Sequence, residues 1–516
     1  MQELINQNYK NFYFLIFIFS IVAYIFFNVA VLNDPILVQH GFRQTHNALV
    51  SYYLIMDGFS FSYEAPNWGE PWSVPHEFPM YQWVVAQITT YLHIPLTVSG
   101  RILSLISGLL VCIPIFHTLK ILKIKKETIF LCLSLILSAP TFIYWSGTFM
   151  IETSALFFSC CFIFFIIKIS LGDRKISTLI FSGGFLSLAM LQKITTAFPV
   201  LLVMGLVLLI YLIKNQSFTK ERIYIAQLAI SLLIPCLIFL AWFLYADYLK
   251  SMNPLMSGLT LTSSIDWYFG TLKDRASSQL WLGTIFESTI IPSSGILIGF
   301  MSFMFFILKN KDKKLKLIIF VSLLLFLVPF LIHTKVHINH KYYQVANIIF
   351  WSIISGLCIN YFIDYLKLHN NKKIFLILFV LLSNYLFFCH KYFFHYKSQI
   401  QEHNKRTIIL GEYIKSNTDS NKPIVIFGYG GSSTLTFYSE RKAISLSSEI
   451  QGVDVINNIH KYLSKKPSSF ILCPYKDSKG KAIDTYDKNK IKELIYKNFN
   501  SFRKNKIILD CEIIYD

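Results

Sequence analysis

The sequence predicts a polytopic α-helical membrane protein with a small C-terminal α/β domain. Hydrophobic residues make up 54% of the 516 residues, and the mean hydropathy is +0.50. Several apolar runs reach the roughly 18–20 residues that cross the core of a bilayer. The net charge is +19, but the basic residues lie in short loops between those runs. These observations exclude an ordinary soluble protein, and the placement of the charge argues against nucleic acid binding.

The first apolar run, residues 12–32, is expected to be a retained anchor. It is longer than the apolar core of a signal peptide, and no small-residue cleavage site follows it. With ten similar runs, about eleven spans are expected. The other ten lie near 99–120, 128–145, 152–170, 176–191, 196–213, 223–246, 286–308, 317–333, 343–364 and 374–391.

Basic loops indicate the orientation of these spans. Five of them lie at 120–126, 168–175, 214–222, 309–316 and 367–373. Because Lys and Arg favour cytoplasmic loops, all five are assigned to the cytoplasm, and the N-terminus lies on the same side. An odd number of spans then leaves the tail outside. We therefore expect a multi-pass protein of the cytoplasmic (inner) membrane with an extracytoplasmic C-terminal domain.

Two domains are expected, a transmembrane domain over 1–391 and an α/β domain over 392–516. The transmembrane domain has long outer loops at 33–98 and 247–285. In the tail, "KPIVIFGYGGSSTLTFYSERKAISL" predicts a strand, a glycine turn, a helix and a second strand. The "GYGGSS" turn lacks the lysine of a P-loop, so we interpret it as an ordinary strand-to-helix turn. Cys473 and Cys511 can pair if the tail is outside the cytosol, although spacing alone does not fix their distance.

A polar cluster, "HGFRQTHN", follows the first span. Together with the nearby aspartate it contains five candidate site residues: Asp34, His40, Arg43, Gln44 and His46. One interpretation is a wet interfacial loop whose arginine meets lipid phosphate. The other is a site for an anionic ligand with proton transfer, since Arg binds phosphate through two hydrogen bonds and His titrates near neutral pH.

Three charged residues on the expected outer side are further candidates. Glu77, in "PHEFPMYQW", is either a sugar- or metal-binding carboxylate or a solvated acid. Glu152 begins an apolar run, where it either favours the positive end of a helix or holds an acceptor. Lys193, in "LQKITTAFP", is either a ligand-binding cation or a lysine that extends to the interface.

The outer turn "HTKVHINHKYYQ" is the last candidate segment. Its candidate substrate-binding residues are His337, His340, Lys341, Tyr342 and Tyr343. A zinc site is weakly supported, because the two histidines lack a neighbouring carboxylate or cysteine. Cations and tyrosine hydroxyls at this depth better fit a lipid phosphate. A polyprenyl-phosphate-linked sugar combines such a phosphate with an apolar tail.

Six segments in order resemble the GT-C superfamily of membrane glycosyltransferases, in the bacterial branch related to protein mannosyltransferases and the aminoarabinose transferase of lipid A. "HGFRQTHN" is similar to H-x-W-R-Q-x-D-T, "HEFPMYQW" to E-x-P-L-Y, and "FMIETSALFF" to M-P-E-x-L-A-L-F-F. "LQKITTAFPV" resembles K-P-x-x-L, "NHKYYQVAN" resembles H-x-Y-Y-x-L-P, and "TFYSERKA" resembles Y-Y-S-x-R-K-G. The likeness runs over most of the chain.

The resemblance implies transfer of a sugar from a polyprenyl-phosphate donor to a lipid, glycan or protein acceptor on the outer face. It implies inversion at the anomeric carbon, an acidic base in the first loop, and cations on the departing phosphate. The sequence departs from this pattern, because the usual Asp-Glu pair falls at Arg43-Gln44 and the subgroup aspartate falls at His46. The catalytic candidates are therefore Asp34, His46 and Glu152.

Two other functions fit parts of this pattern. A flippase or transporter for a lipid-linked sugar would share the cations, and a catalytically inactive assembly subunit would explain the missing acidic pair. Some GT-C members use a divalent metal ion, but the first outer loop holds no D-x-D motif. A metal ion is therefore left open and no metal ligand is assigned.

Overall fold

The computed structural model describes residues 2–215, 221–258, 260, 262–395, 405–476, 482–483, 485–502 and 504–516. Its contacts divide the chain into two compact units. The helical unit consists of Met1–Asn33, Arg101–Trp242 and Ile265–His395, and the mixed unit of Asp34–Gly100, Phe243–Ser264 and Tyr396–Asp516. The first outer loop and the C-terminal domain therefore share one compact unit.

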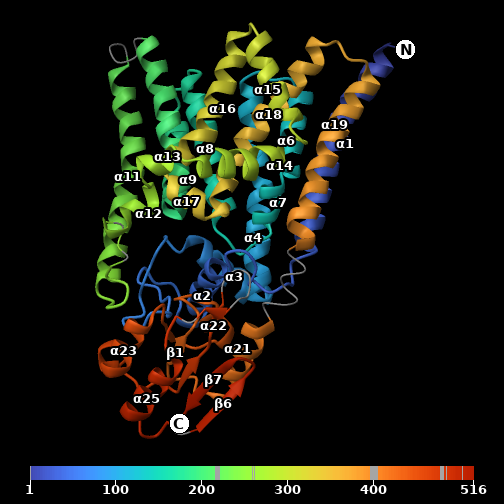
Figure 1. Ribbon diagram of the computed structural model, residues 1–516. Helices are drawn as coiled ribbons and strands as arrows, with labels where there is room; N and C mark the ends of the chain where they lie inside the picture. The colour runs from blue at the N-terminus through green and yellow to red at the C-terminus, as the bar shows by residue number, and fades with distance from the viewer. Residues whose placement is uncertain are drawn as a thin grey trace. The chain divides into compact units, whose positions relative to one another are not determined.

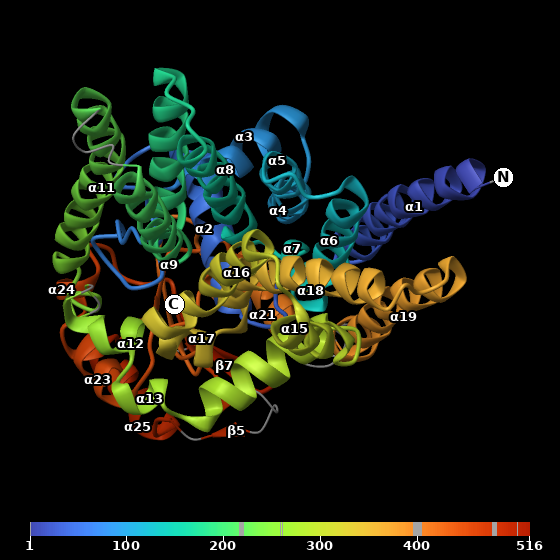
Figure 2. The ribbon, with the colours of Figure 1, turned by 90° about the horizontal axis from the view of Figure 1, so that it is seen from above.

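Long apolar helices build the helical unit. Figures 1 and 2 show α16 (Lys313–Ile332) and α18 (Val345–Tyr365) side by side, and α16 also packs against α9 (Ile176–Lys214). The remaining long helices are α1 (Gln2–Val29), α4 (Leu96–Leu110), α5 (Cys112–Ile121), α6 (Lys126–Ser138), α8 (Glu152–Ser170), α11 (Arg222–Ser251), α15 (Ile298–Lys309) and α19 (Asn370–Phe388). The shorter helical segments are α7 (Pro140–Ser146), α12 (Ile265–Phe269), α13 (Leu272–Arg275), η2 (Gln279–Ile290), α14 (Ile291–Ser293), α17 (Thr334–Asn339), η3 (Lys341–Gln344) and η4 (Cys389–Phe393).

Eight helices of the described residues are long and apolar enough to cross a membrane, or up to 10 if each of two bent pairs is one span. Because of these bends, two of the expected spans are not single straight helices. The span at 128–145 bends by 61° between α6 and α7, where Pro140 starts the second helix. The span at 286–308 bends by 99° between the segment Gln279–Ser293 and α15. Gly295 lies at the second break with φ of 55°, a conformation that glycine adopts without strain.

The helix α9 folds back on itself. It has 39 residues, which as one straight helix would measure about 58 Å, far beyond the roughly 30 Å core of a bilayer. Lys193 interrupts it with extended backbone angles, φ −162° and ψ 99°. Arg174, just before the helix, donates a hydrogen bond to the hydroxyl of Tyr211 near its end at 3.4 Å. The two ends are therefore neighbours, and the two arms correspond to the predicted spans 176–191 and 196–213.

A five-stranded mixed sheet forms the C-terminal part of the mixed unit. The strand order is β2-β1-β3-β7-β6, with β1 parallel to β2 and β3, and β7 antiparallel to β3 and β6. Alternate residues of β1 lie in the two separate apolar cores on its faces, as its position in the middle of the sheet requires. The strands are β1 (Ile424–Phe427), β2 (Ala443–Ser445), β3 (Ser469–Leu472), β6 (Lys504–Ile508) and β7 (Cys511–Tyr515), with a separate pair β4 (Tyr475–Lys476) and β5 (Ala482–Ile483).

Helices flank this sheet, and two more come from the first outer loop. The tail contributes α21 (Lys405–Asn417), α22 (Thr434–Ser439), α23 (Glu449–Asn457), α24 (Ile459–Tyr462) and α25 (Lys488–Asn498). The outer loop contributes α2 (Gly41–Asp57) and α3 (Met80–Leu92), and the short helix η1 (Thr262–Ser264) completes the unit. The membrane-spanning helices and the mixed α/β domain confirm the predicted fold class.

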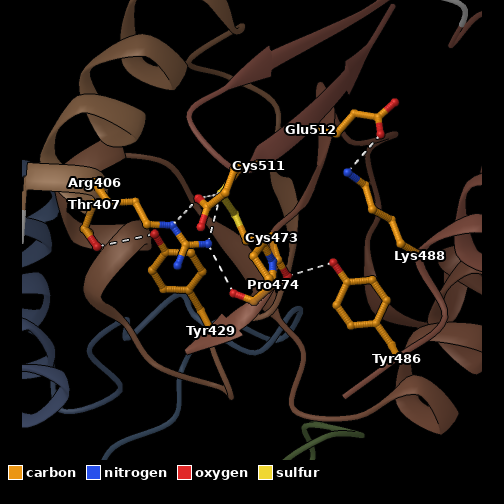
Figure 3. Close-up of a disulfide and its surroundings, with 10 residues drawn as sticks. Arg406, Thr407, Tyr429, Cys473, Pro474, Tyr486, Lys488, Cys511 and Glu512 are labelled. Atoms are coloured by element: carbon orange, nitrogen blue, oxygen red, sulfur yellow. Dashed lines mark hydrogen bonds and ion pairs between the residues drawn. A yellow bond between two sulfur atoms is a disulfide. The ribbon is translucent and has the colours of Figure 1, made fainter. Parts of the chain in front are cut away.

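A disulfide joins Cys473 to Cys511 and ties the end of β3 to the start of β7 (Figure 3). Beside it, the guanidinium of Arg406 forms an ion pair with Asp510 at 2.7 Å and donates a hydrogen bond to the carbonyl oxygen of Pro474 at 3.2 Å. The same guanidinium lies 5.6 Å from the ring centre of Tyr429.

Maleimide labelling of the denatured, unreduced protein is expected to modify seven of its nine cysteines, because two are joined in the disulfide. Replacing both Cys473 and Cys511 by Ser should lower the free energy of unfolding of the α/β domain by about 4 kcal/mol, since the bond closes a loop of 38 residues. Mass spectrometry counts the labelled thiols, and thermal unfolding measures the stability. The control is Cys389→Ser, which removes a free thiol. Nine labelled cysteines without reductant would exclude the bond.

Candidate functional site

Lys193 lies at the point where α9 folds back and forms a buried ion pair. Its side chain is 4% exposed, and its Nζ contacts Oε1 of Glu152, which is 3% exposed. Glu152 is the first residue of α8, so its carboxylate also lies at the positive end of that helix. The burial excludes the interpretation that Lys193 extends to the membrane interface. A buried pair of this kind is stable only while both charges are present.

Two tyrosines from η3 cover the lysine. The Nζ of Lys193 lies 4.0 Å from the ring centre of Tyr343 and 4.7 Å from that of Tyr342. These are cation–π distances, which add attraction in a desolvated position. Lys341 begins η3 and is exposed, and the ring of His340 lies 5.4 Å from that of Tyr342. The structure thus brings Glu152 and Lys193 together with the predicted segment 337–343.

Two buried histidines complete this group. His333 follows α16, His337 lies in α17, and the His337 ring is 5.7 Å from that of Tyr343. Burial, with the nearby charge of Lys193, lowers the pKa of His333 to about 4 and that of His337 well below its ordinary value. Both imidazoles are therefore neutral near pH 7. We call Glu152, Lys193, His333, His337, Tyr342 and Tyr343 the lysine cluster.

Several polar atoms of the lysine cluster have no hydrogen-bond partner within the described part of the chain. They are Oε2 of Glu152, both ring nitrogens of His333, and Nδ1 of His337. Buried polar atoms are normally paired, because an unpaired one costs about 1–3 kcal/mol. Such atoms beside a lysine are suited to a polar ligand. His333 lies in the predicted turn but was not selected from the sequence, where nothing distinguishes it from its neighbours.

A second group lies in the mixed unit, where Arg43 and Glu77 form an ion pair across the first outer loop. The hydroxyl of Tyr63 donates a hydrogen bond to the carbonyl oxygen of Glu77 at 2.8 Å and accepts one from the backbone N–H of His76 at 2.9 Å. The carboxylate of Glu77 is therefore paired with a cation, and Glu77 is not an isolated, solvated acid. The arginine and glutamate reach each other although they are 34 positions apart.

His46 is buried beside a second histidine and a tryptophan. Its ring lies 4.9 Å from that of His76 and 5.7 Å from that of Trp68. Burial, with a contribution from Arg43, lowers the pKa of His46 to about 3, and burial also lowers the pKa of His76 well below its ordinary value. His46 is therefore a weak base near pH 7. We call Arg43, His46, Trp68, His76 and Glu77 the loop cluster.

The other predicted residues of the first loop lie at the start of α2. His40 precedes this helix in a left-handed conformation, with φ of 55°. Gln44 is fully buried, and its amide donates a hydrogen bond to the carbonyl oxygen of Gln39 at 3.3 Å. Asp34 is half-buried upstream of the helix. Trp68 and His76 were missed from the sequence, although His76 directly precedes the selected Glu77.

Within the residues that the structure describes, no group of three or more His, Cys, Asp or Glu side chains is arranged to hold a metal ion. The side chains stacked on His337 and His340 are aromatic rings, those of Phe330, Trp267, Tyr342 and Tyr343, which are not the usual ligands of zinc. The described residues do not form a site for a divalent cation, and we assign no catalytic step to one.

Comparisons with known proteins give one family match and several solved structures of similar fold. Residues 72–247 match the family model described as dolichyl-phosphate-mannose-protein mannosyltransferase. No curated protein matches the sequence. The matched range contains Glu77, Glu152 and Lys193.

Solved structures share the fold of this chain at low sequence identity. The crystal structure of ArnT from Cupriavidus metallidurans bound to undecaprenyl phosphate has a TM-score of 0.63 and 12% identity, over 96% of this chain and 97% of that one. AglB, an oligosaccharyltransferase from Archaeoglobus fulgidus in complex with an inhibitory peptide and a dolichol-phosphate, has a TM-score of 0.55 and 9% identity, over 88% and 69%. The mycobacterial arabinofuranosyltransferase AftD has a TM-score of 0.52 and 9% identity, over 97% and 39%. The predicted fold class and the resemblance to GT-C glycosyltransferases are confirmed.

Removing one partner of the buried pair should destabilise the helical unit. Lys193→Met or Glu152→Gln leaves a buried charge without its counter-ion, which costs about 3–5 kcal/mol. The double variant removes both charges and should recover most of that loss. Thermal unfolding of the detergent-solubilised protein tests this. The control is Lys125→Met, which breaks an exposed pair with Asp364 and should change stability little. Equal losses in the single and double variants would contradict the pairing.

The protein should lose stability as the pH falls from about 6.5 towards 3. The unfolded chain protonates His46 below its ordinary pKa of 6.5, whereas the folded state keeps it neutral to about 3. The folded state thus binds fewer protons in this window, and each such histidine contributes a slope of up to about 1.4 kcal/mol per pH unit. His46→Gln should flatten the pH dependence of thermal unfolding, whereas His93→Gln, at an exposed position, should leave it unchanged. Identical pH profiles for wild type and His46→Gln would contradict the assignment.

Proposed function

We propose that this membrane glycosyltransferase of the GT-C class transfers a sugar from a polyprenyl-phosphate donor to an envelope acceptor, on the outer face of the cytoplasmic membrane and with inversion. The observation that carries the proposal is the lysine cluster. It places a buried cation, two tyrosines and several polar atoms that have no hydrogen-bond partner among the described residues at the ends of membrane helices. A lipid phosphate with an apolar tail is the ligand class that matches both features.

The chemistry follows from where charge develops. An acceptor hydroxyl attacks the anomeric carbon, the bond from that carbon to the phosphate oxygen breaks, and polyprenyl phosphate leaves with the electron pair. The departing phosphate gains negative charge, which Lys193 stabilises in a desolvated position. Lys341 and the hydroxyls of Tyr342 and Tyr343 are the proposed further contacts to the phosphate. A single displacement with one base inverts the anomeric configuration.

We assign the base to Glu152 in preference to Asp34 and His46. One carboxylate oxygen of Glu152 pairs with Lys193, and the other has no hydrogen-bond partner in the described structure, so it can accept the proton of a hydroxyl. His46 is a poorer choice because its pKa of about 3 makes it a weak base. Asp34 is the next candidate.

The loop cluster is proposed to bind substrate rather than to take the proton. Arg43 can contact an anionic group while Glu77 keeps it oriented, and His40 and Gln44 flank it at the start of α2. ArnT bound to undecaprenyl phosphate and AglB in complex with a dolichol-phosphate support a lipid phosphate as the ligand class.

The orientation rests on two independent features. The five basic loops favour the cytoplasm, and the disulfide between Cys473 and Cys511 favours an oxidising compartment for the tail. Both support an α/β domain outside the cytosol, which is the side where a flipped lipid-linked donor is presented.

Two structural features favour competing functions. The spans broken between α6 and α7 and before α15 are typical of transporters, which supports a flippase for a lipid-linked sugar as the second candidate. The low pKa of His46, where the related subgroup has an aspartate, supports an inactive subunit as the third. A transfer assay with the purified protein distinguishes the transferase, the flippase and the inactive subunit.

Purified protein incubated with polyprenyl-phosphate mannose and an envelope extract should release polyprenyl phosphate, measured by mass spectrometry. Lys193→Met, Glu152→Ala and Arg43→Ala should each lower the rate by about 10²–10³-fold, because each removes a group that stabilises or positions the transition state. Lys309→Met, at an exposed helix end, is the control and should retain activity.

Because the single variants can fail to fold, the double variant Glu152→Gln/Lys193→Met serves as a folded, inactive reference. Movement of intact donor across proteoliposomes without phosphate release would establish a transporter. Neither release nor movement, with folded protein, would establish a non-catalytic subunit. Full activity in the folded double variant would overturn the proposed site.

A further inference from the structure

The glycine turn after β1 holds an asparagine from the first outer loop. The amide nitrogen of Asn67 donates a hydrogen bond to the carbonyl oxygen of Gly431 at 2.7 Å, and its amide oxygen accepts one from the hydroxyl of Thr436 at 2.5 Å. Gly431 has a φ of 77°, which glycine adopts without strain. The Asn67 side chain is fully buried, and both its amide nitrogen and its amide oxygen are hydrogen-bonded to the α/β domain. A nucleotide phosphate would need this glycine turn, which is instead bound by the side chain of Asn67.

The same segment of the outer loop also makes backbone hydrogen bonds to the edge of the sheet. The backbone N–H of Ala443 and Ser445 in β2 donate to the carbonyl oxygens of Pro66 and Asn67, at 3.1 and 2.9 Å. A bridge between Trp68 and Ile444 completes the antiparallel pairing. Residues 66–69 therefore lie along the edge of β2, held there by backbone hydrogen bonds and one isolated bridge.

A serine from the turn holds the start of α2. The hydroxyl of Ser433 donates a hydrogen bond to the carbonyl oxygen of Phe42 at 2.9 Å and lies 3.0 Å from the hydroxyl of Thr45. These two residues flank Arg43 in the first turn of the helix. A second contact fixes the chain just upstream, where the backbone N–H of Ile36 donates a hydrogen bond to the hydroxyl of Tyr438 at 3.1 Å.

These two attachments bracket the loop cluster. Asn67 precedes Trp68, whose ring packs against those of His46 and His76. From the other side, the amide of Asn253 donates to the carbonyl oxygens of Trp68 and Gly69, at 3.2 and 3.0 Å. Ser433 fixes the helical turn that carries Arg43, which is paired with Glu77. The positions of Arg43 and His46 therefore depend on contacts made by the tail.

We propose that the C-terminal α/β domain is a positioning module for the first outer loop, with Asn67 and Ser433 as its positioning residues. Asn67 acts through Trp68 on His46, and Ser433 acts through the first turn of α2 on Arg43. The proposal rests on the proposed function for its catalytic consequence. Its structural consequence, an outer loop held in place by the tail, is independent of it.

Hydrogen–deuterium exchange of the full-length protein tests the structural part. Asn67→Ala and Ser433→Ala should each raise the exchange rate of peptides covering 41–57 and 63–76 by about tenfold, because each removes buried hydrogen bonds that oppose local opening. Ser433→Thr, which keeps the hydroxyl, should restore slow exchange. Ser447→Ala, at an exposed position of the same domain, is the matched control. Unchanged exchange in both variants would overturn the proposal.

The catalytic part is tested with polyprenyl-phosphate mannose in the transfer assay. In Asn67→Ala and Ser433→Ala, a small displacement of the loop cluster should lower kcat about 10- to 100-fold with a smaller change in KM. The thermal midpoint of the sheet in both variants should stay near that of Ser447→Ala. Faster exchange with unchanged kcat would overturn the catalytic role of the positioning. If wild type shows no transfer, the proposed function fails, and the exchange experiment still decides whether the tail holds the loop.

Discussion

The buried pair between Lys193 and Glu152 is the interaction on which the helical unit depends. A helix that reverses within the membrane region interrupts its own hydrogen bonds, and buried polar groups there need partners from the protein. The pair ties the reversal of α9 to the first residue of α8, and the tyrosines of η3 cover it. One contact thus fixes the relative positions of three segments. The same contact concentrates the polar atoms that we assign to the donor phosphate.

Helical architecture was largely predictable from the sequence, because apolar runs and basic loops are local signals. The interruption of the helix at Lys193 agrees with the separate spans expected at 176–191 and 196–213, although no glycine or proline lies at the turn. The 99° break before α15 was missed, although Pro292 and Gly295 are local indications of it. Hydropathy does not reveal such a break, because it indicates burial in lipid and not a change in the direction of the helix axis.

The pairing of side chains was not predictable, because it depends on contacts distant in sequence. Lys193 and Glu152 are 41 positions apart, and Arg43 and Glu77 are 34 apart. Each of these four residues was selected as a candidate, but as an isolated charge. Asn67 was overlooked because it stands in "APNWGEP", which reads as a loop between prolines. Its role requires the glycine turn more than 360 positions later, as the separation of 364 between Asn67 and Gly431 shows.

Pairing of residues 66–69 with β2 runs through main-chain atoms, which every amino acid supplies. Substitutions in this segment and in β2 can therefore accumulate without loss of these contacts, provided that proline does not remove a donor. Tolerance of this kind is one physical reason why a fold can persist at 12% identity, as between this chain and ArnT. Truncating the tail, by contrast, removes the hydrogen-bond partners of the first outer loop. The loop and the tail are therefore expected to be inherited together.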